Sequence, residues 1–195
     1  MMTAHLNREA TYEDYLAFRE KAELIDGRIV PMTPTGYLPG WAASLIHRSL
    51  ERHAAEVGGG EPVSQGVGFL LQTPRTQVLV PDVAWWTGAV GLPMEQLRGA
   101  PALAVEVRSK NDYGPTAERE MEHKRALYFA AGTQVVWDAD LARAQVIRAY
   151  RADSPATPLV FRPGEAAHAE PAVPGWRFEV AQLFPDHTKS ATRVR

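Results

Sequence analysis

The sequence predicts a domain of the α/β or α+β class, with a core in the order helix, three strands, helix, strand. Two segments, at about 39–57 and about 116–131, carry apolar residues at helical spacing, and each is followed by glycine. Short apolar runs of strand character lie between these segments and after the second one. We therefore expect an α/β or α+β core with further elements added at both ends.

The length and composition suit one domain with an apolar core. The chain has 195 residues, of which 45% are hydrophobic and 23% charged. We predict an N-terminal extension at 1–10, a single domain at 11–185 and a flexible polar tail at 186–195.

Composition also excludes several kinds of site and setting. The chain has no cysteine, which excludes disulfides, zinc–thiolate sites, iron–sulfur clusters and a cysteine nucleophile, and fits a reducing, cytoplasmic environment. No stretch approaches the roughly 18 apolar residues of a membrane span, and the first ten residues lack the apolar run of a signal peptide. With a formal net charge of −2 there is no general basic coat, so a nucleic-acid partner requires a local patch or a metal ion.

The N-terminal elements are a short helix and a hairpin. Thr11 and Asp14 resemble a capping box, which predicts a helix through about Arg19. Two apolar runs then flank Asp26 and Gly27, and this is the strongest short-range signal for a hairpin because a type I′ turn requires positive φ at both central positions.

The middle of the chain follows the first long helix with three extended segments. The stretch 63–71 alternates apolar residues at period two, with Gln65 as an exception, and after a turn 78–86 resumes an extended pattern. A linker rich in Gly and Pro, which allows a short helix near 93–98, leads to 102–107, a continuous apolar run typical of a buried strand.

The C-terminal part begins with a polar loop at 109–115 and the second long helix. We predict a strand at 135–137, a turn at 138–140 and a strand at 146–150. Six prolines follow from Pro155 onward, so we expect short strands and loops there.

Two carboxylates conflict with their apolar surroundings. Asp82 interrupts the apolar segment 78–86, and Glu106 lies near the end of 102–107. A carboxylate on a buried strand is costly unless it is paired or bound to metal. For each residue alone, a salt bridge or a position just past the buried part is the alternative interpretation.

A lysine interrupts one face of the second long helix. Lys124 lies in a single helical stripe with apolar and small residues. The members of this stripe are Ala117, Met121, Lys124, Tyr128 and Ala131. The ammonium either extends to solvent along an apolar stem or faces what the helix covers.

Together these residues suit a metal-dependent phosphodiesterase site. Mg²⁺ prefers oxygen ligands, which Asp82, Glu106 and the Val107 carbonyl could supply. Such an ion lowers the pKa of a bound water and offsets charge on the phosphate. Lys124 is then placed to orient that water or to stabilise the developing charge.

Two further basic residues are candidate substrate contacts. Arg108 follows Glu106 by two positions and is expected on the same strand face, where it would contact a phosphate. We predict that Lys110, in the loop that follows, also binds the substrate.

The order and spacing of several short motifs resemble the PD-(D/E)xK nuclease fold and, within it, the Uma family of restriction endonucleases. The matching pieces are Glu23 to Gly27, Pro81 to Val83, Glu106 to Ser109, Lys124 to Tyr128, Gly132 before Val136 to Asp138, and Pro174 to Trp176 with Leu183 and Phe184. Together they span about 10–185.

This resemblance implies a restriction-endonuclease-like core, a mixed central sheet flanked by helices, with an N-terminal helix and hairpin. It implies that Asp82 and Glu106 bind Mg²⁺ (or Mn²⁺) and that the lysine of the (D/E)xK triplet has moved onto the helix as Lys124. Glu23 would be a further acidic member of the site, and an exposed hairpin carboxylate is its alternative. DNA is the implied substrate, and a homodimer is expected by analogy because cutting both strands favours two sites.

Two other functions remain open from the sequence alone. A catalytically inactive binding or assembly module would keep the fold and use the carboxylates and lysine as ion pairs. The near-neutral charge, and the loop in which Lys110 and Asn111 follow Ser109 where the family has Pro-Ser, favour it slightly. The second of these functions is that of a metal-dependent phosphodiesterase that acts on a small nucleotide.

Overall fold

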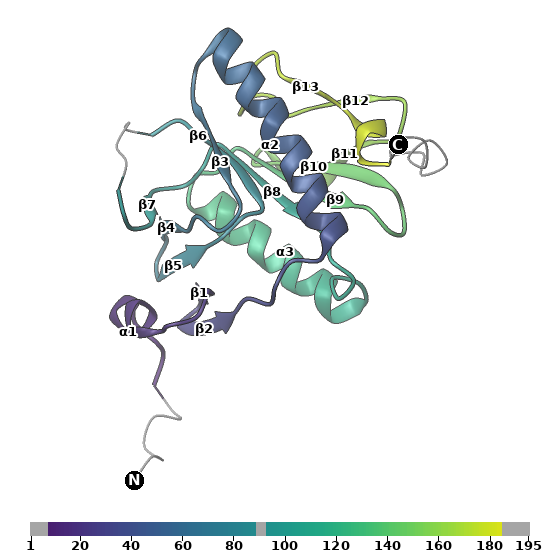
Figure 1. The fold of residues 1–195 in the computed structure, drawn as a ribbon. Coiled ribbons are helices and arrows are strands. Elements are labelled where there is room, and N and C mark those ends of the chain that lie inside the picture. Colours follow the sequence, from purple (N-terminus) through teal and green to yellow (C-terminus); the bar gives the residue numbers. More distant parts are fainter. Residues whose placement is uncertain (1–7, 89–92, 185–195) are drawn as a thin grey trace, which may run out of the picture.

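The computed structural model describes residues 8–88 and 93–184, and these form two large sheets, a small two-stranded sheet and two long helices (Figure 1). A six-stranded sheet has the order β11-β10-β9-β8-β6-β3, and a five-stranded sheet has the order β2-β1-β5-β4-β7. Both sheets are mixed in strand direction. This confirms the predicted α+β architecture.

The N-terminal helix and hairpin form as predicted. Helix α1 (Tyr12–Ala17) begins with the capping box of Thr11 and Asp14 and ends slightly earlier than expected. Strands β1 (Ala22–Ile25) and β2 (Arg28–Pro31) pair antiparallel.

The turn of this hairpin has the expected backbone. Asp26 and Gly27 have φ of 48° and 71°. A Cβ on Gly27 would lie 2.7 Å from Cβ of Glu9, so glycine is also required for space. The hairpin therefore packs against the segment that precedes α1.

The two long helices also form. Helix α2 (Tyr37–Val57) begins slightly earlier than predicted and ends at Gly58, which has a φ of 76°. Helix α3 (Pro115–Ala130) is one residue displaced at each end from the predicted span.

The two long extended segments in the middle are each divided between the sheets. The stretch predicted as one strand at 63–71 is β3 (Glu61–Ser64) and β4 (Phe69–Gln72), and the next is β5 (Thr76–Leu79) and β6 (Val83–Trp86). Pairing of β4 with β5 and of β3 with β6 makes a bent hairpin that passes from the five-stranded to the six-stranded sheet. The prediction of unbroken strands was wrong because period-two alternation continues across a bend.

The next two elements are strands. The prediction of a short helix near 93–98 was wrong, since β7 (Leu97–Arg98) pairs parallel with β4. The buried strand at 102–107 is confirmed as β8 (Leu103–Val107).

Strand β9 (Val135–Asp140) corrects another prediction. The turn expected at 138–140 does not form, and the strand continues through Asp138 and Asp140. Both aspartates are buried, and arginine side chains pair with them, which offsets the cost of burying their charges. The aspartates that suggested a turn therefore lie within the strand, where they form ion pairs with arginines.

The C-terminal elements are strands and one 3-10 helix. They are β10 (Val146–Arg151), β11 (Ser154–Phe161), β12 (Ala166–His168), β13 (Arg177–Glu179) and a 3-10 helix (Val180–Leu183). Strand β11 is longer than the short strands expected after Pro155. The predicted tail at 186–195, and most of the predicted extension at 1–10, lie outside the described residues.

Helices α2 and α3 lie against opposite faces of the six-stranded sheet. Alternation along β8 turns Leu103, Val105 and Val107 toward α2 in the larger apolar core. Ala104 packs on the other face with Tyr128 of α3 and with residues of the five-stranded sheet. Glu106 shares this second face with Ala104, so it lies under α3.

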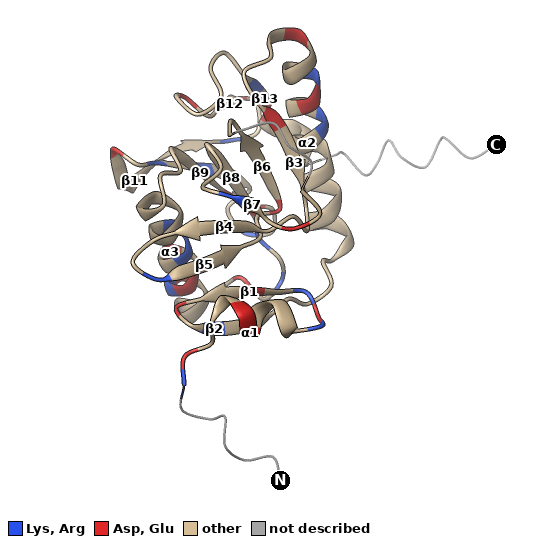
Figure 2. Ribbon diagram, turned by 90° about the vertical axis from the view of Figure 1, so that its left-hand side faces the viewer, with Lys and Arg blue, Asp and Glu red and all other residues tan. Residues whose placement is uncertain are grey.

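Charged residues of both signs lie on the C-terminal half of α2 and along α3, whereas the strands are mostly uncharged (Figure 2). Among the described residues, no helix is long and apolar enough to cross a membrane.

Candidate active site

Three predicted site residues meet between the two sheets and α3. The Lys124 Nζ lies 2.8 Å from Oε1 of Glu23 and 2.9 Å from Oε1 of Glu106. Their side chains are 10–19% exposed, so most of their surface is covered and a small part remains accessible. The lysine does not extend to solvent, and Glu23 is not an exposed hairpin carboxylate.

Asp82, the fourth predicted site residue, is hydrogen-bonded to the end of β8, the strand that carries Glu106. It lies in the bend between β5 and β6 and not within a strand, because Pro81 before it has no N–H for a sheet ladder. Its backbone N–H donates to the Val105 carbonyl at 2.9 Å, and its Oδ2 accepts from the Val107 N–H at 2.7 Å. These two bonds hold Asp82 against the end of β8, beside Glu106.

Glu23 also holds the bend. Its Oε1 accepts a hydrogen bond of 2.7 Å from the Val80 N–H as well as the Lys124 contact. One carboxylate oxygen thus connects β1, the segment that leads to Asp82, and α3.

Sequence reasoning missed two partners of the carboxylates. The Tyr128 hydroxyl donates to Glu106 Oε1 at 2.9 Å, and the Gln65 Nε2 donates to Asp82 Oδ1 at 2.9 Å. Tyr128 had a signal, since it follows Lys124 by one helical turn on the same stripe. Gln65 appeared only as an exception to an apolar pattern, and nothing local indicates its partner.

Burial and like charge act together on these acids. Burial raises the pKa of Glu106 to about 8, and the charges of Asp82 and Glu23 add to this rise. Burial also raises the pKa of Asp82. For Lys124, burial lowers the pKa, but the charges of Glu106 and Glu23 outweigh it and hold the pKa above its usual range.

The charge balance of the site suits a cation. Two carboxylates contact one ammonium, and a third, that of Asp82, lies close enough for its charge to raise the pKa of Glu106. Oxygen ligands are those that hard divalent cations prefer. Within the described residues, no set of three or more His, Asp or Glu side chains forms a ready metal cluster. A cation here would therefore complete its coordination with water and substrate oxygens, as Mg²⁺ usually does.

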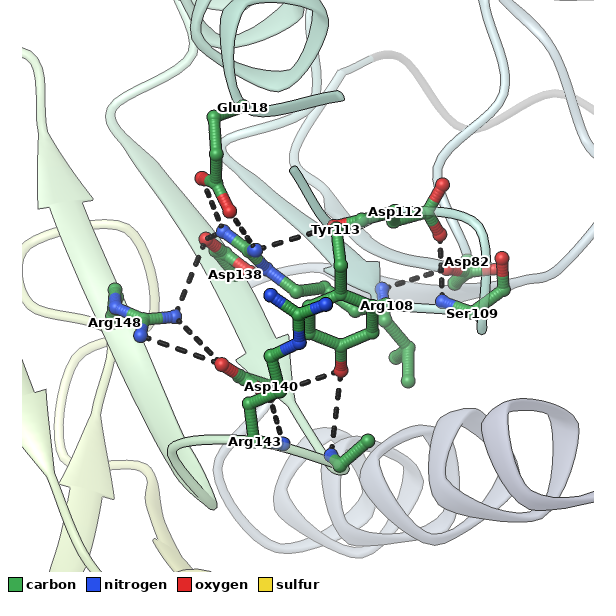
Figure 3. A network of polar contacts seen from close by, with 12 residues as sticks. Asp82, Arg108, Ser109, Asp112, Tyr113, Glu118, Asp138, Asp140, Arg143 and Arg148 are labelled. Carbon is green, nitrogen blue, oxygen red and sulfur yellow. Dashed lines mark hydrogen bonds and ion pairs between the residues drawn. The ribbon is translucent and has the colours of Figure 1, made fainter. Parts of the chain in front are cut away.

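Arg108, the predicted phosphate contact, is held by acidic side chains of the protein. Its Nε and Nη2 donate to the two carboxylate oxygens of Asp138 at 2.6 and 2.7 Å, and its Nη2 also donates to Glu118 at 2.9 Å (Figure 3). The side chain is 3% exposed. The guanidinium is thus engaged by the buried Asp138 and the exposed Glu118, and its position on the strand does not reveal these partners.

The Arg108 network also holds the loop that follows β8. Arg108 donates to the Asp112 carbonyl at 3.3 Å, and the Asp112 carboxylate accepts from the Ser109 N–H at 2.6 Å. Figure 3 shows these residues beside Asp82, whose pKa the Asp112 charge helps to raise. Lys110 is exposed in this loop.

The arrangement of the elements is that of a nuclease-like fold. It is similar to a crystal structure described as "a putative nuclease belonging to DUF820" from Anabaena variabilis ATCC 29413. The TM-score is 0.71 at 17% sequence identity, over 89% of this chain and 97% of that chain. At this identity the similarity establishes the fold alone.

The sequence then identifies the family. Residues 11–181 match the sequence model of the Uma2 family, described as "Putative restriction endonuclease", and the chain belongs to this family. Proteins with curated functions include no match to this chain. The family resemblance and the fold expected from it are both confirmed.

Proposed function

We propose that this protein is a divalent-cation-dependent endonuclease that hydrolyses phosphodiester bonds of DNA. The observation that carries the proposal is the contact of Lys124 with both Glu23 and Glu106, beside Asp82. This constellation has more acid than base, is partly accessible, and lies in a chain of a restriction-endonuclease family.

Asp82 and Glu106 are the residues that would hold Mg²⁺ or Mn²⁺, with the Val107 carbonyl as a third candidate ligand. When bound, such an ion lowers the pKa of a water and offsets the charge that develops on the phosphate.

Lys124 acts as a donor and a positive charge, and not as a general base. Because its pKa is held above the usual range, it stays protonated at neutral pH. An ammonium in this position orients the attacking water or stabilises negative charge in the transition state. Glu23 keeps it there through the 2.8 Å contact.

The remaining proposed contacts concern the substrate and the assembly. Lys110 is exposed in the loop beside Asp82 and is our candidate for a phosphate contact. We also propose that two copies act together, because cleavage of both strands needs two sites. Sedimentation of the protein with and without DNA tests this assembly.

The variant Glu106→Gln tests the proposed activity. It preserves the size of the side chain and an oxygen acceptor for Tyr128 and Lys124, but the amide cannot ionise to bind a cation. We expect it to abolish nicking of plasmid DNA in Mg²⁺ while the thermal unfolding temperature changes little. Glu122→Gln, on an exposed part of α3, is the matched control and should cleave normally.

Cation binding separates this function from its alternatives. Titration calorimetry with Mn²⁺ should show binding to the native protein and none to Asp82→Ala. A native protein that binds no cation would instead be a binding or assembly module. Undiminished cleavage by Glu106→Gln would remove that residue from the mechanism. DNA binding that weakens with salt counts against a small-nucleotide substrate.

A further inference from the structure

Glu106 is held by one of its two carboxylate oxygens. Its Oε1 accepts the Tyr128 hydroxyl at 2.9 Å and contacts the Lys124 Nζ at 2.9 Å. Within residues 8–88 and 93–184, no donor forms a hydrogen bond with Oε2. The two oxygens of the same carboxylate therefore have different surroundings.

The tyrosine that makes this contact is fixed in the core. Tyr128 is fully buried and packs with Phe69, Leu71 and Leu79 of the five-stranded sheet. Its neighbours leave the ring little freedom, so the position of its hydroxyl is fixed. Because Lys124 lies one turn earlier on α3, the helix presents both donors to Oε1 as one rigid unit.

We propose that Tyr128 is a positioning residue, which holds Glu106 by Oε1 and so leaves Oε2 as the oxygen that binds the cation. This inference rests on the proposed function and specifies how its second metal ligand is oriented. Outer partners of metal ligands fix ligand orientation, and their loss typically lowers metal affinity about 10- to 100-fold.

The alternative is that Tyr128 only fills the core. Tyr128→Phe separates the two roles, since it keeps the ring and its packing and removes only the hydroxyl. Lys124 still contacts Oε1 in this variant, so the buried carboxylate keeps a partner. Tyr113→Phe is the matched control, because it also removes a hydroxyl that donates to a carboxylate, at 3.0 Å from Asp140 Oδ1.

The experiment measures Mn²⁺ affinity by electron paramagnetic resonance, well below the unfolding temperature. We expect Tyr128→Phe to bind Mn²⁺ about 10- to 100-fold more weakly than the native protein, and Tyr113→Phe to bind as the native protein does. Cleavage by Tyr128→Phe should recover as Mn²⁺ is raised, because the reacting groups are all present.

The outcomes distinguish this inference from the proposed function. Native affinity in Tyr128→Phe, together with lost affinity in Glu106→Gln, overturns the role of Tyr128 and leaves the cation site intact. Absence of Mn²⁺ binding to the native protein overturns both. A lower unfolding temperature with unchanged affinity assigns Tyr128 to the core alone and also overturns the inference.

Discussion

The Lys124 Nζ on α3 lies 2.8 Å from the Glu23 carboxylate on β1, so the N-terminal hairpin and the second long helix meet in the candidate active site. A neighbouring contact strengthens this junction, since the His123 Nε2 lies 2.6 Å from Asp26 Oδ2 in the hairpin turn. The hairpin is therefore part of the site and supplies one of the acids that hold the lysine.

Replacement of Lys124 by alanine should impair catalysis more than cation binding. The substitution removes the ammonium and leaves the carboxylates of Asp82 and Glu106 in place. Loss of one preorganised donor typically lowers the rate by about 10²- to 10³-fold. We expect a decrease of this size in plasmid nicking, with Mn²⁺ affinity kept or increased.

Lys21→Ala, which changes an exposed lysine outside the site, is the control for this variant. Equal losses of nicking and Mn²⁺ affinity in Lys124→Ala would make Lys124 a structural residue.

Cation binding at neutral pH should release a proton from Glu106. Burial, with the charges of Asp82 and Glu23, raises the pKa of this group from its ordinary 4.5 to about 8 in the metal-free protein. At pH 7 the group is therefore mostly protonated, and a cation requires the carboxylate form. The release should decrease as the pH rises above 8, where the proton is already lost.

Calorimetry in buffers of different ionisation enthalpy measures this proton. The observed binding enthalpy should depend on the buffer at pH 7 and no longer do so at pH 9.5. A buffer-independent enthalpy at pH 7 in the native protein contradicts the prediction.

Removal of Arg108 should destabilise the fold. Arg108 and Asp138 form a bidentate pair whose side chains are 3% and 1% exposed. Without Arg108, among the described residues, only Arg148 Nη1, at 3.7 Å, would face the Asp138 carboxylate. Breaking a buried pair typically costs about 3–5 kcal/mol. We expect the free energy of unfolding of Arg108→Ala, measured in urea, to fall by about this amount.

The exposed pair of Arg151 and Asp153 is the control, and Arg151→Ala should cost less than about 1 kcal/mol. If Arg108→Ala kept native stability and lost only DNA binding, the result would support the prediction that Arg108 contacts a phosphate of the substrate.

Gly27→Ala should loosen the hairpin that carries Glu23. The residue has a φ of 71°, and a Cβ would lie 2.7 Å from Glu9 Cβ. Left-handed backbone alone costs about 1–2 kcal/mol for an alanine. We expect a loss of stability in urea beyond that of Gly58→Ala, where φ is 76° and the space is open. Equal losses in both variants would mean that the contact with Glu9 contributes nothing.

Much of the candidate site could be predicted from local patterns. Asp82, Glu106 and Lys124 each conflict with apolar neighbours, and burial makes such conflicts costly unless the groups meet. The tertiary structure brings them together with Glu23. Their roles in metal binding and catalysis stay predictions.

Other parts could not be predicted because they depend on partners distant in sequence. Asp138 resembles a turn residue until Arg108 is placed against it. Gln65 donates a hydrogen bond to Asp82 only because a bend in the central hairpin brings the two residues together. Arg108 was assigned to phosphate by its strand position, and the nearest buried acid determined its actual contact.

The sequence by itself determined the hairpin turn, the two long helices, the buried strand β8 and the stripe on α3 that carries Lys124. These follow from φ requirements and from the spacing of apolar residues, both of which act over a few neighbouring positions. The tertiary structure decided that the central strands divide between two sheets, that β9 continues through Asp140, and that Arg108 binds Asp138. The physical reason is that periodicity determines which face a side chain takes, whereas its partner is determined by the elements that the whole chain packs against that face.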